Sequence, residues 1–185
     1  VRKSLLNNNF LIELITSSED IKNFKSNKFC EKILELHPNR IEGIIHTIND
    51  NISDRLDYSK VKSKLLFGSN KIHESILDLK FEISMSSFFQ TNPQSAEKLY
   101  SQVYEYIFEK NISKNDVILD LFCGTGTITQ IIASKNPNLK VIGVDIVEKA
   151  IENAIKSTKK NKIPNASFFT GDVGKFLYQK NELIN

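Results

Sequence analysis

The stretch "DVILDLFCGTGTITQIIA", residues 116–133, decides the fold of the second half of the chain. A short apolar run leads to an acid, Asp120, and is followed by two glycines with one residue between them, Gly124 and Gly126. The residues after Gly126 are amphipathic at helical spacing. Glycine lets the backbone turn sharply and lets a ligand approach it without a Cβ in the way. The stretch therefore predicts a strand, a tight glycine turn that faces a ligand, and a helix.

The residues after Asn115 repeat this alternation. Strands are predicted at 116–121, 139–144 and 166–170, and helices at 126–134 and 147–161. Alternating strands and helices predict a parallel sheet with right-handed crossovers, which is a doubly wound α/β domain. In such a sheet a ligand binds beyond the carboxyl ends of the strands.

A helix is predicted to begin at Asn92-Pro93, because asparagine is a good N-cap and proline suits the first helical position. Apolar and aromatic residues recur in it every four positions: Leu99, Val103 and Ile107, with Tyr100, Tyr104 and Phe108. These aromatics could stack on bases, but the spacing favours a core. The α/β domain is predicted to span 93–185.

Residues 1–92 are predicted to form a small mixed α+β domain. A strand is expected at 9–16, and a helix begins at Ser18 or Asp20 and ends before Pro38. A nearly continuous apolar strand follows at 40–49. Residues 49–54 resemble a turn, and 63–92 contains short strands broken by Gly68, Ser69 and Asn70.

The composition is that of an ordinary globular protein, with 40% hydrophobic and 25% charged residues in 185. No apolar run approaches the roughly 20 residues that span a bilayer, so no membrane partner is predicted. Cys30 and Cys123 follow no pairing rule, which favours the cytoplasm. A net charge of +3 permits a nucleic-acid partner without requiring one. The chain starts at Val1 and its one methionine is Met85, so we expect an internal piece of a longer protein.

The glycine turn lacks the features of a pyrophosphate site. A dinucleotide fingerprint would have a third glycine where Thr129 stands, and the Gly-Lys-Ser/Thr of a phosphate-binding loop is absent. Asp120 before the turn instead favours a cationic or zwitterionic ligand. Asp145 ends the next strand, where it can accept both hydroxyls of a ribose, and Asp172 follows the third strand, where it can accept from an adenine amino group. Together they predict S-adenosylmethionine as the cofactor.

Three segments together resemble the RNA uracil-5-methyltransferases, which make 5-methyluridine in ribosomal and transfer RNA. They are "FEISMSSFFQTNPQSAEKLY", "ILDLFCGTGTITQIIA" and "VIGVDIVEKAIENA". "GIIHTIND" and "LLFGSNKIHESI" also resemble that family's central domain. The resemblance covers nearly the whole chain and is strongest from Phe81 to Asp172. Its most specific part is the Ser-Phe-Phe-Gln-x-Asn signature at 87–92.

The resemblance implies a class I, Rossmann-like methyltransferase fold, a doubly wound parallel sheet that is incomplete at the C-terminus and preceded by a partial, RNA-facing central domain. Gln90 matches the family's glutamine that contacts the cofactor. Phe122 matches the aromatic position in the family's Asp-Leu-Tyr/Phe-Cys-Gly motif, and Thr127 matches the position after the second glycine. Asp145 stands where the family usually has a ribose-binding glutamate, and Asp172 matches the acid near adenine. The predicted cofactor site is Gln90, Asp120, Phe122, Gly124, Gly126, Thr127, Asp145 and Asp172.

Simpler roles remain open for the aromatic and amide side chains. Phe122 could pack, Gln90 could cap the helix that starts at Pro93, and Phe88 and Phe89 could be interdomain core. Phe88 could also stack on a flipped base of the RNA substrate.

The resemblance assigns Cys123 to the cofactor turn, not to catalysis. In the family the nucleophilic cysteine lies far downstream and follows an Asp-Pro-Pro-Arg segment, which these 185 residues lack, as they lack the later glutamate. Cys30 matches no iron–sulfur pattern, and neither a metal nor a cluster is predicted. We expect this piece to hold the cofactor and to be inactive by itself.

The implied substrate is RNA, ribosomal (23S) rather than transfer RNA. Two other classes stay open at this point. One is a methyltransferase of another base or of a small molecule, and the other is a non-catalytic module that binds cofactor or RNA.

Overall fold

The computed structural model describes residues 1–19, 21–51, 56–58, 60–109, 112–113 and 116–179. The chain divides into two compact units. The first is Val1–Glu74 with Glu82–Ser86, and the second is Ser75–Phe81 with Ser87–Asn185. Within the described residues, no helix is long and apolar enough to cross a membrane.

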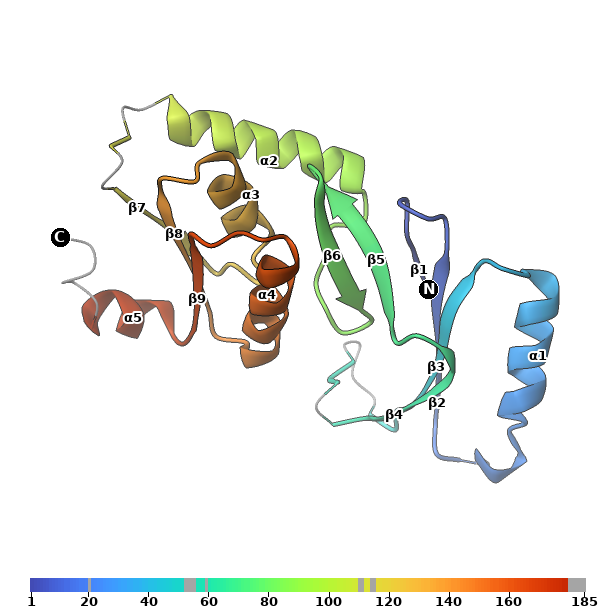
Figure 1. Ribbon diagram of the computed structural model, residues 1–185. Helices are drawn as coiled ribbons and strands as arrows, with labels where there is room; N and C mark the ends of the chain where they lie inside the picture. The colour runs from blue at the N-terminus through green and yellow to red at the C-terminus, as the bar shows by residue number, and fades with distance from the viewer. Residues whose placement is uncertain (20, 52–55, 59, 110–111, 114–115, 180–185) are drawn as a thin grey trace. The chain divides into compact units, whose positions relative to one another are not determined.

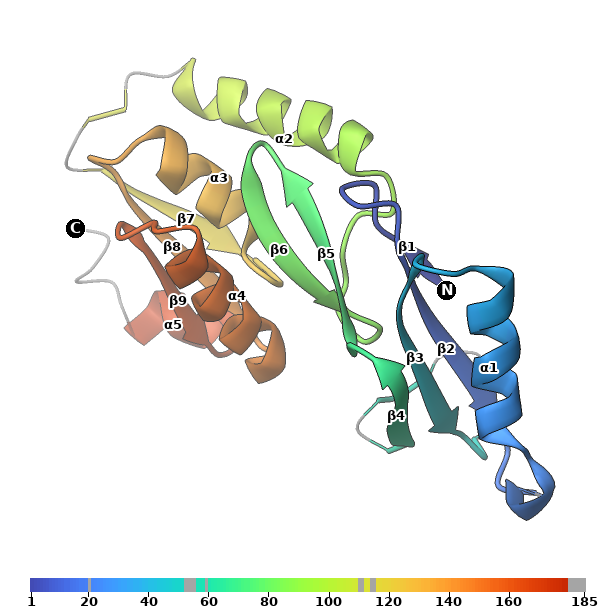
Figure 2. The same cartoon turned by 45° about the vertical axis from the view of Figure 1, so that its right-hand side comes forward.

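The first unit contains a four-stranded sheet of order β1-β2-β3-β4, with strands Arg2–Lys3, Phe10–Thr16, Ile41–Ile48 and Lys62–Gly68. Strands β2 and β3 are parallel, whereas β1 and β4 pair antiparallel with their neighbours. Helix α1 (Ser26–Leu36) makes the crossover between β2 and β3 and lies along one face of the sheet in Figure 2. The strands predicted at 9–16 and 40–49 are confirmed.

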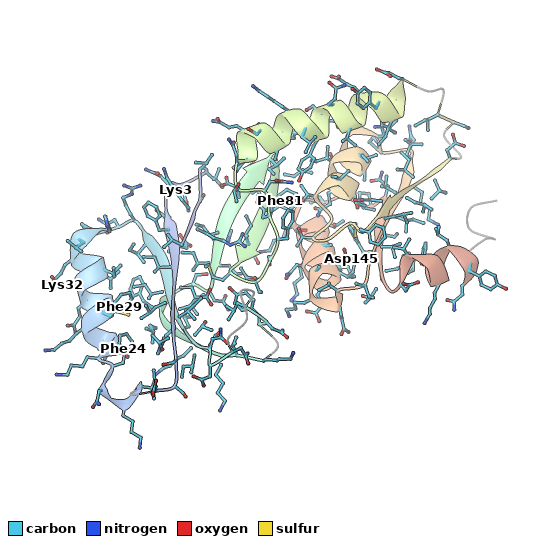
Figure 3. All side chains as sticks on the ribbon, turned by 180° about the vertical axis from the view of Figure 1, so that it is seen from behind. Lys3, Phe24, Phe29, Lys32, Phe81 and Asp145 are labelled. Carbon is cyan, nitrogen blue, oxygen red and sulfur yellow. The ribbon has the colours of Figure 1, made fainter. Side chains whose placement is uncertain are left out.

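The predicted start of the first helix is wrong. Helix α1 begins at Ser26, after a single 3-10 turn, η1 (Ile21–Asn23), and it ends before Pro38 as expected. Ser18 does not cap it, because its N–H donates to Oδ1 of Asp50 at 2.6 Å and so belongs to a loop tied to the end of β3. Phe24 and Phe29, labelled in Figure 3, pack with ring centroids 6.2 Å apart at the start of α1. Asp20 and positions 52–54 of the expected turn lie outside the described residues.

Strands β5 (Lys71–Ile76) and β6 (Leu79–Ser84) form a hairpin, so the predicted short strands after Asn70 are confirmed. Leu77 and Asp78 make its two-residue turn with φ values of 48° and 66°, the left-handed geometry that matches the twist of a hairpin. The N–H of Leu77 donates to Oε1 of Glu97 at 2.8 Å, which ties the turn to the next helix within the second unit.

Helix α2 (Pro93–Phe108) begins as predicted, with the Asn92 side chain accepting the N–H of Ser95 at 3.1 Å. Its buried side is Pro93, Ala96 and Tyr100. Of the aromatic residues expected in the core, Tyr100 is buried, whereas the neighbouring Leu99 is 53% exposed.

The second unit is built on three parallel strands in the order β7-β8-β9, Val117–Leu121, Lys140–Asp145 and Ala166–Thr170. Helices α3 (Thr127–Lys135) and α4 (Glu148–Lys160) connect them, and α5 (Val173–Gln179), which the sequence pattern did not reveal, follows β9. All five predicted elements from 116 to 170 are confirmed to within one residue at each end.

Both faces of this sheet are covered by helices. Ile142 and Val144 point to the face where Phe176 of α5 packs. Helices α3 and α4 lie on the opposite side, as Figure 1 shows. The second unit therefore has a doubly wound α/β architecture.

Candidate functional site at the glycine turn

The turn after β7 is built from residues with left-handed backbone angles. Phe122, Gly124 and Gly126 have φ values of 66°, 56° and 73°. The N–H of Cys123 donates to the carbonyl of Val144 at 3.0 Å, which extends the β7–β8 pairing, and the N–H of Gly126 donates to the carbonyl of Cys123 at 2.9 Å and closes the turn. Positive φ is rare for a bulky residue such as phenylalanine. This backbone leaves the Phe122 side chain 77% exposed, so the alternative that it packs in the interior is wrong.

Asp145, at the end of β8 and labelled in Figure 3, fastens this turn to its neighbours. Its Oδ2 accepts the N–H of Gly124 at 2.8 Å and its Oδ1 accepts the N–H of Val147 at 2.9 Å. Its main-chain carbonyl accepts the N–H of Gly171 at 2.9 Å. A carboxylate has about four acceptor positions, so Asp145 retains capacity for further donors.

Asp120 is turned toward helix α3. Its Oδ2 accepts both the N–H and the hydroxyl of Thr129, at 3.0 and 2.5 Å. Burial raises the pKa of Asp120, the two bonds from Thr129 lower it, and the charge of Asp145 raises it. Thr129 stands where a dinucleotide fingerprint would have its third glycine. Its side chain is fully buried, and its hydrogen bonds to Asp120 connect α3 to β7. No local period relates positions nine residues apart across a turn, so the sequence carries no signal for this pair.

The side chains of the Ser-Phe-Phe-Gln segment differ in their contacts and in their exposure to solvent. Phe89 packs against Phe81 with ring centroids 5.7 Å apart, whereas Phe88 is 77% exposed. Gln90 hydrogen-bonds to the hydroxyl of Tyr100. The cap of α2 is Asn92, so the alternative that Gln90 caps this helix is wrong.

Two further predicted residues lie at helix starts. Thr127 is the first residue of α3 and is 8% exposed. Asp172 is exposed, and its Oδ1 accepts the N–H of Lys175 at 2.9 Å in the first turn of α5. Asp145 is the last residue of β8 and Asp172 comes two residues after the end of β9, which pairs with β8.

The thiols of the chain are protonated at neutral pH. The pKa of Cys123 is raised to about 12, chiefly by burial and then by the charges of Asp120 and Asp145. Burial also raises the pKa of Cys30, with a contribution from Glu31. A cysteine acts as a nucleophile most readily when the pKa of its thiol is lowered. The environment of Cys123 raises this pKa, which favours a structural role for Cys123 over a nucleophilic one. Where the structure describes the chain, no group of three His, Cys, Asp or Glu residues could hold a metal ion.

Residues 112–183 match the model of a methyltransferase domain. An uncharacterized RNA methyltransferase of Clostridium acetobutylicum is 43% identical over 183 residues, and one of Caldanaerobacter subterraneus is 38% identical over 187. The chain covers 38% and 39% of their lengths and 98% of it is aligned in each case.

Solved structures share the fold. The tRNA (uracil-54, C5)-methyltransferase of Pyrococcus abyssi, in complex with S-adenosyl-L-homocysteine, superposes with a TM-score of 0.68 at 23% identity, over 92% of this chain and 38% of that one. A SAM-dependent methyltransferase of Agrobacterium tumefaciens gives 0.53 at 15% identity, over 83% and 45%. The second unit therefore has the class I methyltransferase fold, and the chain spans less than two fifths of the length of the curated relatives it matches.

Proposed function

We propose that the glycine turn binds S-adenosylmethionine and that the protein containing this chain methylates C5 of a uridine in RNA. The observation that carries the cofactor assignment is the hydrogen bond from the N–H of Gly124 to Asp145, 2.8 Å long. It fixes an acidic side chain at the end of β8 beside a turn whose backbone is open to a ligand, which is where doubly wound sheets bind nucleosides.

The residues of the turn fit such a ligand. A Cβ placed on Gly124 would meet no atom within 4 Å, so the space over the turn is open on that side. Asp145 is only partly buried and Phe122 is 77% exposed. An exposed aromatic ring and a carboxylate with free acceptor capacity are the groups that an adenosine requires, one for its flat base and one for its ribose hydroxyls.

We assign the contacts as follows. Asp145 accepts from the ribose hydroxyls, Phe122 lies against the adenine, and Asp172 accepts from the adenine amino group. Asp120 and Gln90 face the charged amino-acid end. Gly124, Gly126 and Thr127 shape the backbone beneath it. The cofactor supplies an electrophilic methyl group when bound.

The proposed substrate follows from the relatives and from the Ser-Phe-Phe-Gln signature. The relatives named above are RNA methyltransferases by name, and a structure with the same fold is a uracil C5 enzyme. Phe88 is exposed, as stacking on an unpaired base requires. The residues that resemble the central domain favour ribosomal (23S) over transfer RNA.

Methylation at C5 of uracil needs a thiolate that adds to C6 and a base that removes the C5 proton. Neither cysteine of this chain has an environment that favours the thiolate. We therefore assign to these residues the binding and orientation of the methyl donor, and we expect no turnover from this chain by itself.

Calorimetric titration of the chain with S-adenosylmethionine tests the cofactor assignment. We expect binding by the wild type, and an affinity roughly 10- to 100-fold lower for Asp145→Ala, since hydrogen bonds to a charged group contribute about 1.5–3 kcal/mol. Glu148→Ala, a neighbouring acid on α4, is the matched control and should bind like the wild type. A folded wild type that does not bind would refute the assignment.

The substrate is tested separately with the full-length protein. Deleting its gene should remove 5-methyluridine from one position in ribosomal RNA, detected by mass spectrometry of digested RNA, and leave transfer RNA unchanged. Loss from transfer RNA alone would refute the ribosomal assignment, and loss of a different modification would refute uracil C5 as the target.

A further inference from the structure

The ring of Phe168 occupies the space beneath the glycine turn. Phe168 lies in β9, and its register partner in β8 is Gly143, whose own partner in β7 is Asp120. Register partners in a sheet point to the same face, so these three residues form one row on the side covered by α3 and α4. Gly143 has no side chain, and the Phe168 ring lies across the space that this leaves.

The space is filled closely. A Cβ on Gly143 would lie 2.7 Å from Cδ1 of Phe168 and 2.9 Å from Sγ of Cys123, both shorter than real contacts. A Cβ on Gly126 would lie 2.7 Å from Cζ of the same ring and 3.0 Å from Cβ of Ala154 in α4. One ring therefore touches the strand below the turn and the turn itself.

We propose that Phe168 is a positioning residue that sets the height of the glycine turn above the sheet and thereby the affinity for the cofactor. The proposal rests on the cofactor assignment above. Interiors are close-packed, so a methyl group added at Gly143 must displace the Phe168 ring or the Cys123 thiol. The same ring also lies against Gly126, so its displacement acts on the turn. Displacement of Gly126 shifts the backbone that connects it to Gly124 and, through Gly124, to Asp145.

Gly143→Ala tests this idea, because Gly143 has an ordinary φ and alanine is strained there only by its neighbours. We expect its affinity for S-adenosylmethionine, measured by calorimetry, to fall about tenfold or more. Phe168→Ala should lower the affinity less, and the double variant Gly143→Ala/Phe168→Ala should bind more tightly than Gly143→Ala, although the contact with Sγ of Cys123 remains. This rescue is the signature of a shared steric contact.

Phe169→Ala is the matched control, since Phe169 is the next residue of β9 and packs on the other face against Phe176, with ring centroids 5.4 Å apart. We expect Phe169→Ala to lower the free energy of unfolding and to leave the affinity for the cofactor unchanged. Each calorimetric titration is made at a temperature at which urea denaturation shows the variant to be folded. This separates loss of stability from loss of positioning.

The outcomes also separate the two proposals. A folded wild type that does not bind the cofactor refutes the cofactor assignment. If the wild type binds and Gly143→Ala binds equally well, or if the double variant is no better than Gly143→Ala, the positioning role of Phe168 is refuted while the cofactor assignment stands.

Discussion

The N–H of Gly124 donates to Oδ2 of Asp145 across 2.8 Å, and the other oxygen of the same carboxylate accepts the N–H of Val147 at 2.9 Å. One side chain thus holds the turn after β7 and the entry to α4 at once. The carboxylate is suited to this because both of its oxygens accept and neither donates.

Asp145→Asn should therefore lower stability even though it preserves shape. An amide offers one oxygen, so one of the two main-chain N–H groups then faces an NH₂ group. We expect a loss of about 1–2 kcal/mol in the free energy of unfolding, measured by urea denaturation. Asp172→Asn is the control, because Asp172 uses a single oxygen, toward Lys175, which an asparagine can replace; its change should stay within about 0.5 kcal/mol. Equal effects at both positions would contradict this account.

Asp120 should make stability fall as pH rises. Burial raises its pKa above the ordinary value of 3.8, so the folded state holds a proton that the unfolded state has already released. Stability is then greatest below 3.8 and decreases as pH rises through the folded pKa. Asp120→Asn keeps an acceptor for Thr129 and removes this dependence. The free energy of unfolding is measured by urea denaturation from about pH 4 to about pH 7. As pH rises, the free energy of unfolding of the wild type should fall relative to that of Asp120→Asn. A difference that is constant with pH would show that the carboxylate is not perturbed.

Cys123 should be almost inert to alkylation. With a pKa of about 12, it has roughly a thousandfold less thiolate than an ordinary cysteine at neutral pH. In a Cys30→Ser background, where Cys123 is the single thiol of the chain, iodoacetamide should react far more slowly with the folded protein than with the protein in urea. Equal rates would mean that the thiol is exposed and ionises normally.

Asn161 should be important for the attachment of segment Ser75–Phe81, which contains the turn of the β5–β6 hairpin, within the second unit. Its Oδ1 accepts the N–H of Lys80 at 2.9 Å, and its Nδ2 donates to the carbonyl of Lys80 at 3.1 Å and to Oε1 of Gln130 at 2.9 Å. Asn161→Ala leaves the Gln130 oxygen, in a fully buried side chain, without this donor. We expect a loss of about 1–3 kcal/mol and faster hydrogen exchange at the Lys80 amide.

Lys156→Ala, an exposed substitution on α4, the helix that Asn161 caps at its C-terminus, is the control for Asn161→Ala and should change stability by less than about 0.5 kcal/mol. If both variants lose the same stability, the contribution is that of helix α4 in general and not of the amide.

Local patterns were sufficient for the elements of the second unit from Pro93 to Thr170, whereas helix α5 was missed. Its strands are short apolar runs bounded by turn residues, its helices have a clear 3.6-residue period, and Asn92-Pro93 marks the start of α2 by its own chemistry. Where local signals were weak, prediction failed. The region before α1 offers Ser18 as a plausible cap, but a hydrogen bond to Asp50, 32 residues away, keeps it in a loop.

By itself, the sequence determined that a glycine turn follows an acid-bearing strand and that further acids end the next two strands, since these are properties of neighbouring residues and of their order. Only the tertiary structure decided which groups meet: Gly124 with Asp145, Asp120 with Thr129, and the ring of Phe168 with Gly143 and Gly126. Such pairs depend on strand register and on the shape of the space that each glycine leaves. Both arise when strands and helices pack, and neither is present in any local pattern of residues.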